Sequence, residues 1–229
     1  MDPGERADCY GRSVDCCASP SDPRVARRFD REWGEWDDAD GFPPMVDVSA
    51  RLLDRLRDAP LLRPSVLEIG CGAGAVSAAL LEMGARTVKG VDLSAESVEV
   101  ARRRTEAAGL GTQAIFEVGH GADVHGEAHD WVVLDRVLCC DGHPDRLLDA
   151  TIGAARSRVA ITAPESRGWR GLLNRPMWAA ENVWDLMHGG CRGYLHDLRR
   201  VERRLTQAGF RLEAKDHIDL WFVGVYDRA

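Results

Sequence analysis

The stretch SVLEIGCGAGAVS, residues 65–77, decides the fold of this chain. It begins with an apolar run suited to a buried strand of a parallel sheet, and the alanine- and leucine-rich residues 75–83 predict a helix packed on that strand. The turn between them contains Gly70, Gly72 and Gly74. Glycine permits positive φ and lets a ligand approach the backbone, while the free N–H groups of the following helix attract anions. We therefore expect an anionic or nucleotide-like ligand at this turn.

The glycine pattern alone fits two classes of cofactor. Gly70, Gly72 and Ala75 also match the dinucleotide fingerprint G-x-G-x-x-G/A, so an NAD-dependent oxidoreductase is an alternative reading. A second predicted strand, residues 87–92, ends in Asp92. A carboxylate at this distance from the turn can bond both ribose hydroxyls of an adenosine cofactor, and both classes use such an acid.

An acid two residues before the first glycine separates the two classes. In the pattern Glu68-x-Gly70-x-Gly72-x-Gly74 the chain resembles the class I S-adenosylmethionine-dependent methyltransferases. In that family this acid lies close to the amino-acid end of the cofactor, whereas nicotinamide-binding sheets usually have an apolar residue there. The resemblance implies S-adenosylmethionine as cofactor, held by these residues: Glu68, Gly70, Cys71, Gly72, Gly74, Asp92, Leu93, His120 and Asp135.

More narrowly, the run RVLCC at residues 136–140, together with Cys16 and Cys17, is similar to a bacterial subgroup grouped loosely with magnesium-protoporphyrin methyltransferases. That similarity does not fix the acceptor. His120 departs from the family, which usually offers an acid to the adenine amine at this place; its imidazole could bond the adenine edge or face solvent. His120, His125 and His129 fall close together but show no clear ligand geometry, so we expect no metal site.

Composition excludes several classes of protein. The chain has 229 residues, a formal net charge of -7 and 45% hydrophobic residues, which suits one globular α/β domain and disfavours a surface that tracks nucleic-acid phosphates. No apolar run approaches the ~20 residues of a membrane span, and the first residues do not resemble a signal peptide. Seven cysteines, an odd number, do not suggest a secreted disulfide framework. We predict a cytoplasmic protein that acts on a small-molecule acceptor, without a nucleic-acid or membrane partner.

Predicted strands and helices alternate through most of the chain. We expect a Rossmann-like three-layer α/β sandwich with a seven-stranded, mostly parallel sheet, and the resemblance implies an antiparallel last strand. The expected strands are residues 65–69, 87–92, 113–118, 130–134, 158–162, 210–215 and 220–226. The expected helices are residues 24–36, 46–56, 75–83, 95–108, 143–155 and 194–208.

Two segments interrupt this alternation and are predicted to cap the site. Residues 1–46 form an N-terminal lid or cap, and the methyltransferase domain, residues 47–229, carries a cap insertion at about 163–193. Long aromatic insertions at the carboxyl end of such a sheet tend to form acceptor pockets. The tryptophans of the insertion could line the acceptor pocket or form part of the core: Trp169, Trp178 and Trp184. Its arginines could bind a carboxylated acceptor or lie on an exposed loop: Arg167, Arg170 and Arg175.

Methyl transfer from a sulfonium is an in-line displacement, so alignment and exclusion of water matter more than a strong base. Candidate acceptor-side residues are Cys139 and Cys140, which follow the fourth strand, with His143 and Tyr194 to orient or deprotonate the acceptor. The cysteines could bind a thiophilic acceptor as thiolates, or they could be small buried packing residues. A protein that keeps the cofactor pocket without turnover, as a sensor or partner subunit, is the rival function.

Overall fold

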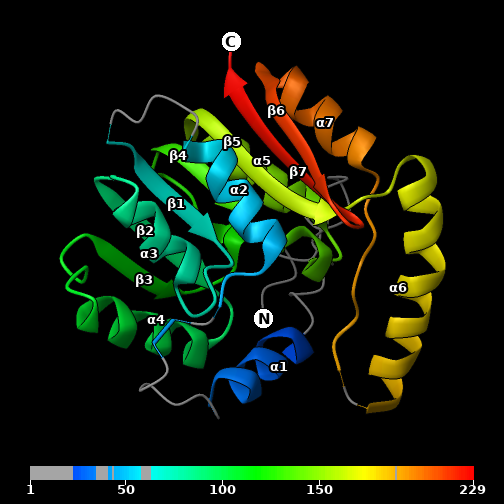
Figure 1. The fold of residues 1–229 in the computed structure, drawn as a ribbon, viewed down its shortest axis with the longest axis horizontal. Coiled ribbons are helices and arrows are strands. Elements are labelled where there is room, and N and C mark those ends of the chain that lie inside the picture. Colours follow the sequence, from blue (N-terminus) through cyan, green and yellow to red (C-terminus); the bar gives the residue numbers. More distant parts are fainter. Residues whose placement is uncertain (1–22, 35–40, 43, 58–62, 189) are drawn as a thin grey trace, which may run out of the picture.

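The computed structural model describes residues 23–34, 41–42, 44–57, 63–188 and 190–229. Within these residues one sheet has the strand order β3-β2-β1-β4-β5-β7-β6, with helices on both faces (Figure 1). The strands are β1 (Ser65–Ile69), β2 (Thr87–Asp92), β3 (Ala114–Val118), β4 (His129–Leu134), β5 (Ala155–Pro164), β6 (Phe210–Ile218) and β7 (Trp221–Arg228). β1 to β5 are parallel, and β7 is antiparallel to both β5 and β6. The predicted sandwich and its antiparallel last strand are confirmed.

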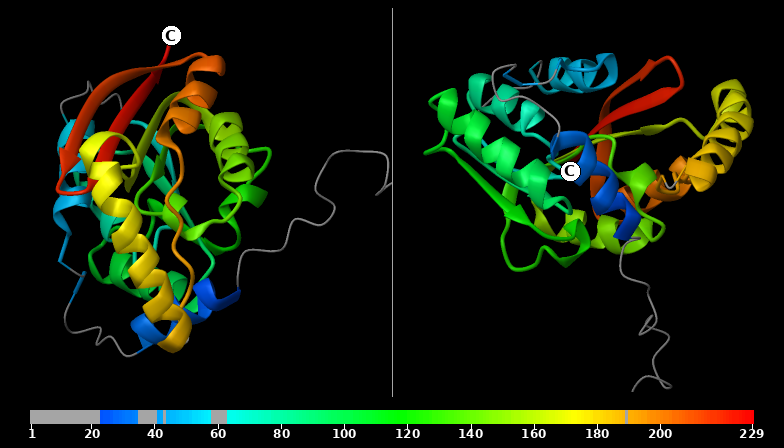
Figure 2. Two further views of the ribbon diagram at one scale, coloured as in Figure 1. Left: turned by 90° about the vertical axis from the view of Figure 1, so that its right-hand side faces the viewer. Right: turned by 90° about the horizontal axis from the view of Figure 1, so that it is seen from below.

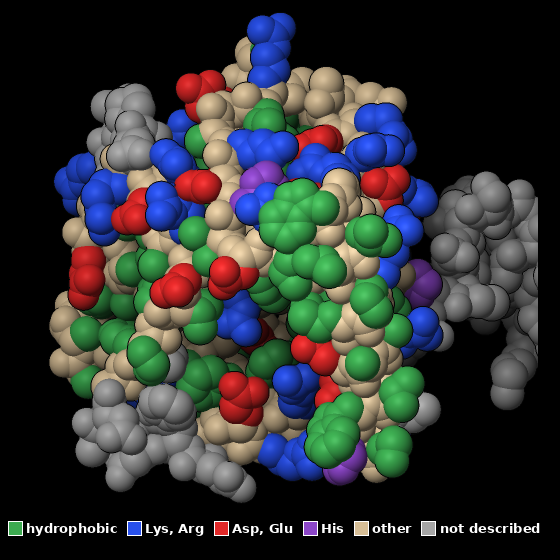
Figure 3. All heavy atoms as spheres, turned by 45° about the vertical axis from the view of Figure 1, so that its right-hand side comes forward, with side chains coloured by type: hydrophobic (Ala, Val, Ile, Leu, Met, Phe, Trp, Pro, Cys, Tyr) green, Lys and Arg blue, Asp and Glu red, His purple; other side chains and the backbone are tan. Residues whose placement is uncertain are grey.

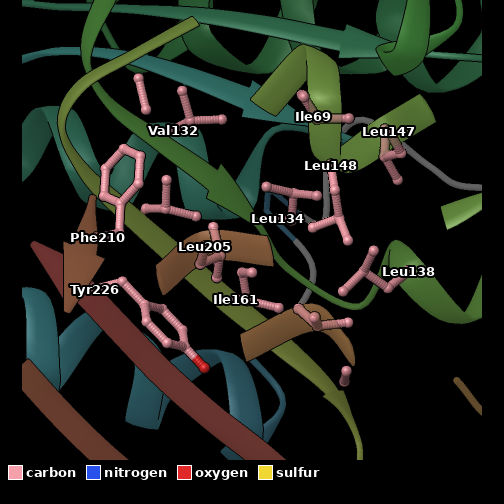
Figure 4. Close-up of a cluster of buried hydrophobic side chains, with 14 of the residues drawn as sticks. Ile69, Val132, Leu134, Leu138, Leu147, Leu148, Ile161, Leu205, Phe210 and Tyr226 are labelled. Carbon is pink, nitrogen blue, oxygen red and sulfur yellow. The ribbon is translucent and has the colours of Figure 1, made fainter. Parts of the chain in front are cut away.

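Alternation along the strands divides the core into two layers. On β1, Leu67 packs toward α5 and α7, whereas its neighbour Val66 packs toward α2 and α3, because successive strand residues point to opposite faces. Figure 4 shows the layer that includes α5 and α7. The helices are α1 (Pro23–Gly34), α2 (Asp47–Arg57), α3 (Ala75–Glu82), α4 (Ala95–Ala107), α5 (Pro144–Ala154), α6 (Gly168–His188) and α7 (Leu198–Gln207), with short 3-10 turns η2 (Gly121–Asp123) and η3 (Leu138–Cys140). Burial on both faces explains why β1 and β4 are nearly continuously apolar.

The prediction of a helix from residue 194 was wrong at its start. α7 begins at Leu198, and the carboxylate of Asp197 caps it by accepting from the Arg199 N–H at 2.9 Å. Before the cap, the Tyr194 N–H donates to the Cys139 carbonyl at 2.8 Å. This long-range bond holds residues 194–197 in a non-helical path along the edge of the sheet.

Two helices lie outside the sandwich. α1 packs on α4 with Val25 buried, and the Ser94 hydroxyl at the start of α4 donates to Asp30 at 2.6 Å. α6 runs along one side of the molecule, and its far end lies beside α1, where Arg28 and Asp185 approach to 3.7 Å (Figure 2). The expectations for residues 1–22 and 35–36, including Cys16 and Cys17, fall outside the described residues. No helix within the described ranges has the length and apolar content to cross a bilayer.

Candidate cofactor and acceptor site

The glycine turn after β1 needs glycine for two different reasons. Gly70 has φ +75, and a Cβ there would lie 2.1 Å from Val137, so the turn packs directly on the loop after β4. Gly74 has φ +82 and a Cβ would lie 3.0 Å from Ala101 of α4. Gly72 has φ +49, but a Cβ would meet nothing within 4 Å. Among the described residues the backbone at Gly72 is therefore open on its outer side, which leaves room for a ligand, and its role in holding the cofactor stays a prediction.

Asp92 joins the end of β2 to this turn. Its carboxylate accepts from the Gly72 N–H and from the Ser94 N–H, each at 2.9 Å. Burial raises the pKa of Asp92, and the backbone N–H bonds partly oppose that shift. β2 therefore ends in an acid that two backbone N–H groups hold beside Gly72, and the sequence had predicted that this strand ends in Asp92.

Glu68 lies on β1, almost wholly buried beneath the turn. The Ser77 hydroxyl of α3 donates to its Oε2. Burial raises the pKa of Glu68 to about 8, the Ser77 bond opposes this, and the negative charges of Asp135 and Asp92 add to it. Near neutral pH this carboxyl holds a proton, and a cation placed beside it would favour the ionised form.

Asp135 connects three elements at the end of β4. The Ser49 hydroxyl of α2 donates to one of its oxygens, and the Thr162 hydroxyl of β5 donates to the other at 2.6 Å. Thr162 in turn accepts from the Arg136 N–H at 2.8 Å. Ser49 and Thr162 carry no signal in the sequence, since only the folded sheet brings them to this carboxylate.

His120 and Asp141 face each other at the end of β3. The His120 ring accepts from the Ala122 N–H at Nδ1, 2.9 Å away, and its Nε2 lies 3.7 Å from Asp141 Oδ2. Asp141 is buried, and its other oxygen accepts from the His143 N–H at 2.7 Å. Its Oδ2 is itself buried and has no hydrogen-bond partner among the described residues. Sequence reasoning expected the segment after the fourth strand, residues 135–141, at the carboxyl edge of the sheet, but it gave this acid no role, because Asp141 lies twenty-one positions from His120.

Two further predicted cofactor residues differ in what they can offer. The Cys71 side chain packs among Val98, Ala101 and Phe116. Burial raises its pKa well above the usual range, so only its backbone is available to a ligand. Leu93, which directly follows β2, is half-buried, and its contact with the cofactor stays a prediction.

The two adjacent cysteines of η3 are not equivalent. Their sulfurs are 3.9 Å apart, and the buried Cys139 thiol donates to the Arg136 carbonyl at 3.3 Å. The pKa of Cys139 is raised well above the usual range by its contact with Cys140 and by burial. The pKa of Cys140 is lowered, first by the Cys139 contact and then by the positive charges of Arg28 and Arg136, although burial opposes this. Of the two thiols, Cys140 is therefore the more readily ionised.

Arg136 adopts φ +58, an uncommon conformation for a side chain other than glycine, at the turn that leads into η3. Arg28 of α1 donates to the Cys191 sulfur at 3.5 Å. Two guanidinium groups from distant parts of the chain thus lie near the thiols at the edge of the sheet. Such a pair favours an anionic group.

The remaining acceptor-side candidates lie around Asp141. Tyr194 packs on Gly142, and its ring stacks on His196, with centroids 5.8 Å apart. His196 Nε2 lies 2.8 Å from the Asp141 carbonyl. The side chain of His143, at the start of α5, is exposed and makes no capping bond. In the part of the chain that the structure describes, no group of three or more His, Cys, Asp or Glu side chains could hold a metal ion.

Comparison with known proteins identifies the family. The methyltransferase domain family matches residues 66–157. The chain is 30% identical over 183 residues to a ubiquinone biosynthesis O-methyltransferase of Methylocella silvestris, covering 70% of this chain and 68% of that protein. It is also 30% identical over 204 residues to a protein of the same name from an Azoarcus species, covering 84% of each. The chain belongs to the class I S-adenosylmethionine-dependent methyltransferases.

The fold comparison agrees with this family. The crystal structure of magnesium protoporphyrin IX methyltransferase from Synechocystis, with bound S-adenosylhomocysteine (SAH), superposes on this chain with a TM-score of 0.67 at 20% sequence identity. The match covers 89% of this chain and 98% of that one. At that identity the similarity shows the fold alone. Because the chain belongs to this methyltransferase family, it uses S-adenosylmethionine as its cofactor, and the NAD-dependent alternative is dropped.

Proposed function

We propose that this methyltransferase transfers its methyl group to an ionised oxygen, a phenolate or a carboxylate, of a small-molecule acceptor. The observation that carries the proposal is the placing of two arginines around η3. Arg28 reaches across from α1 to donate to the Cys191 sulfur at 3.5 Å, beside Asp185, and Arg136 lies at the turn into η3, where both positive charges lower the pKa of Cys140. A carboxylate or phenolate is the kind of group that such a pair holds in its charged, nucleophilic form. The names of the relatives, which include O-methyltransferases, support oxygen as the methylated atom.

When bound, S-adenosylmethionine supplies an electrophilic methyl group on a sulfonium. In this proposal Asp92 binds the ribose hydroxyls, Gly72 leaves room for the cofactor, and Glu68 lies toward its amino-acid end. Arg28 and Arg136 keep the acceptor oxygen ionised and oriented, so no strong base is needed. Tyr194 and His143 border the acceptor, and Cys140 contributes to its wall. Asp135 acts by fixing the loop after β4 to its neighbours.

His120 and Asp141 complete the adenine end in the same proposal. Because His120 Nδ1 accepts from the Ala122 N–H, a neutral ring carries its proton on Nε2 and can only donate there. An adenine ring nitrogen accepts such a bond, but the adenine amine needs an acceptor. The unpartnered Oδ2 of Asp141, 3.7 Å from Nε2, supplies it. In this proposal, Asp141 accepts from the adenine amine in place of the acid that the family usually has at the position of His120.

Transfer of radiolabel from S-adenosylmethionine tests the proposed acceptor class. A panel of phenols and carboxylic acids is compared with amines and thiols of similar shape, and Arg136→Gln is expected to lose turnover on the oxygen acceptors while binding SAH as wild type does. Arg146→Gln, an exposed arginine of α5, is the matched control and keeps turnover. Transfer confined to amines or thiols would contradict the proposal.

The rival reading, a sensor or partner subunit, predicts a different result. Tight SAH binding by calorimetry, with no labelled product from any lysate fraction, would favour it over the enzyme. Calorimetry thus separates failure of the acceptor proposal from failure of cofactor binding.

A further inference from the structure

α6 differs from every other described helix in the face that it turns to solvent. Among the described residues, seven of the eleven exposed large apolar side chains belong to α6. They are Trp169, Leu172, Leu173, Met177, Val183, Trp184 and Met187. Figure 3 shows hydrophobic side chains, in green, gathered down one flank of the molecule, with charged side chains between some of them. We call these seven residues the α6 stripe; a concentration of exposed apolar side chains of this kind marks an interaction site.

The opposite face of α6 is hydrogen-bonded to the rest of the domain. The Asn174 amide donates to the carbonyls of Glu165 and Leu220, both at 2.8 Å. The Asn182 amide exchanges two bonds with the backbone of Gly193, at 2.9 and 2.7 Å, and the Trp178 ring packs on that glycine. Rotating the stripe inward would break these buried bonds, so the stripe must be covered from outside if it is covered at all.

The stripe is nearly symmetric about its own midpoint. Counting outward from Trp178, Leu173 corresponds to Val183, Leu172 to Trp184, and Trp169 to Met187. We propose that a second copy of this chain covers the stripe, with the two α6 helices antiparallel about a two-fold axis at their midpoints. In a two-fold interface the same surface must complement itself, and this arrangement places each large residue against its counterpart.

Charge favours the antiparallel direction. The N-terminal half of α6 carries Arg170 and Arg175, and the C-terminal half carries Glu181 and Asp185. Antiparallel pairing lays the basic half over the acidic half of the second copy, whereas parallel pairing would lay like charges together. The acidic half also opposes seating the whole helix on an anionic bilayer.

The exposed area is of the right size for a dimer. Trp169 is 61% exposed and Trp184 is 64% exposed. A whole tryptophan side chain buries on the order of 200 Å², so the exposed parts of these two supply roughly 250 Å², about a third of the ~800 Å² that each partner of a standard interface buries. The other five residues of the stripe extend the same surface over the length of the helix.

Pairing would also stabilise the acceptor side of the site. Asn182 and Trp178 hold Gly193, and the next residue, Tyr194, donates to the Cys139 carbonyl. A dimer through the stripe therefore restrains the segment that borders η3. The proposal concerns assembly and does not depend on the acceptor.

Sedimentation velocity and light scattering on the full chain test this dimer. Wild type is expected to sediment as a dimer that dissociates on dilution, and Leu172→Glu with Trp184→Glu is expected to weaken association at least hundredfold while SAH binding stays unchanged. Ile115→Glu, an equally exposed apolar residue on β3, is the matched control and leaves the dimer intact. A monomeric wild type at all concentrations, or a dimer that survives the double substitution, would overturn the proposal.

A photo-crosslinking residue at position 172 tests the direction of pairing. The expected adduct joins position 172 of one copy to residues 183–187 of another, as mass spectrometry of the linked peptides would show. Adducts only to residues 1–22, or only to residues 169–173 of the second copy, would overturn the antiparallel arrangement. Sedimentation of monomeric wild type with phosphatidylglycerol vesicles would instead assign the stripe to a membrane surface and overturn the dimer.

Discussion

On the cofactor side of the sheet edge, the turn at residues 70–74 presents backbone, whereas on the acceptor side the loops around η3 present side chains. Gly72 and Asp92 are linked through a backbone N–H, and their spacing follows from two neighbouring strands. Arg28, Cys140 and Tyr194 come from three separate segments that meet only in the folded chain. The cofactor side thus depends on local geometry and the acceptor side on tertiary packing. The predictions below follow that contrast.

The largest effect is expected at Gly70. An alanine Cβ would meet Val137 at 2.1 Å in a left-handed conformation, so Gly70→Ala should lower the free energy of unfolding by about 3 kcal/mol and abolish SAH binding. Gly84→Ala is the control: it has φ +104 but nothing within 4 Å, so it should show strain alone, about 1 kcal/mol. Urea denaturation measures both. Equal losses in the two variants would mean that the contact with Val137 is unimportant.

Asp92→Ala should bind SAH at least tenfold more weakly. Two hydrogen bonds from ribose hydroxyls to a charged group are lost, each worth ~1.5–3 kcal/mol. Titration calorimetry measures the change, with Asp123→Ala, an exposed acid of η2, as the control that retains affinity. Undiminished binding by the Asp92 variant would remove this carboxylate from the pocket.

Glu68 should couple cofactor binding to pH. With a pKa of about 8 the free protein holds this proton at neutral pH, and the cationic cofactor favours its release. Affinity for S-adenosylmethionine should therefore rise roughly eightfold between pH 6.5 and 7.5, with nearly one proton released, as calorimetry in buffers of different ionisation enthalpy would show. Glu68→Gln should remove both effects. A pH-independent wild type would place the cofactor's charge away from Glu68.

The same shift predicts how the free protein's stability depends on pH. The folded pKa of Glu68 lies above the ordinary 4.5, so its contribution is fully present below about 4.5 and is lost as the pH rises through about 8. Wild type should lose more stability than Glu68→Gln across that window in thermal unfolding. Parallel curves for the two proteins would contradict the shift.

Asp141→Asn should alter selectivity at the adenine edge more than overall affinity. Wild type should prefer SAH over S-inosylhomocysteine, whose purine lacks the amine, and the variant should lower that preference by about fivefold because its amide donates where a carboxylate accepts. Asparagine can still accept from the His143 N–H, so α5 keeps its start. Calorimetry with both nucleosides decides it, and an equal loss for both would contradict a contact with the amine.

The fold and the geometry of the glycine turn were predictable because their signals are local. Val66 and Leu67 point to opposite layers of one buried strand, and Asp92 follows a strand that pairs with it in register. β4, whose residues 131–134 are all apolar, is the central strand, the fourth of seven. Short sequence windows contain all of this information.

The acceptor side was less predictable because its contacts are distant in the sequence. The run from Tyr194 to Ala208 has a helical pattern throughout, yet the Asp197 cap and the Tyr194 bond to Cys139 delay the helix. Asp141 becomes notable only when its oxygen is seen beside His120 without a partner. The domain division at residue 47 and the roles of the site residues stay predictions.

The smallest effect is expected at the two thiols, and it tests whether they differ as their surroundings suggest. Iodoacetamide should modify Cys140 roughly tenfold faster than Cys139, because neighbouring guanidinium charges favour the Cys140 thiolate whereas burial and the bond to the Arg136 carbonyl keep Cys139 protonated. Fragment-ion mass spectrometry of the shared peptide locates the label. Cys140→Ser should change SAH affinity less than twofold and raise the acceptor KM, while Cys139→Ser should mainly lower stability, since it places a hydroxyl in apolar packing. Faster labelling of Cys139 would contradict the assigned order of reactivity, and an unchanged acceptor KM in Cys140→Ser would assign Cys140 to packing alone.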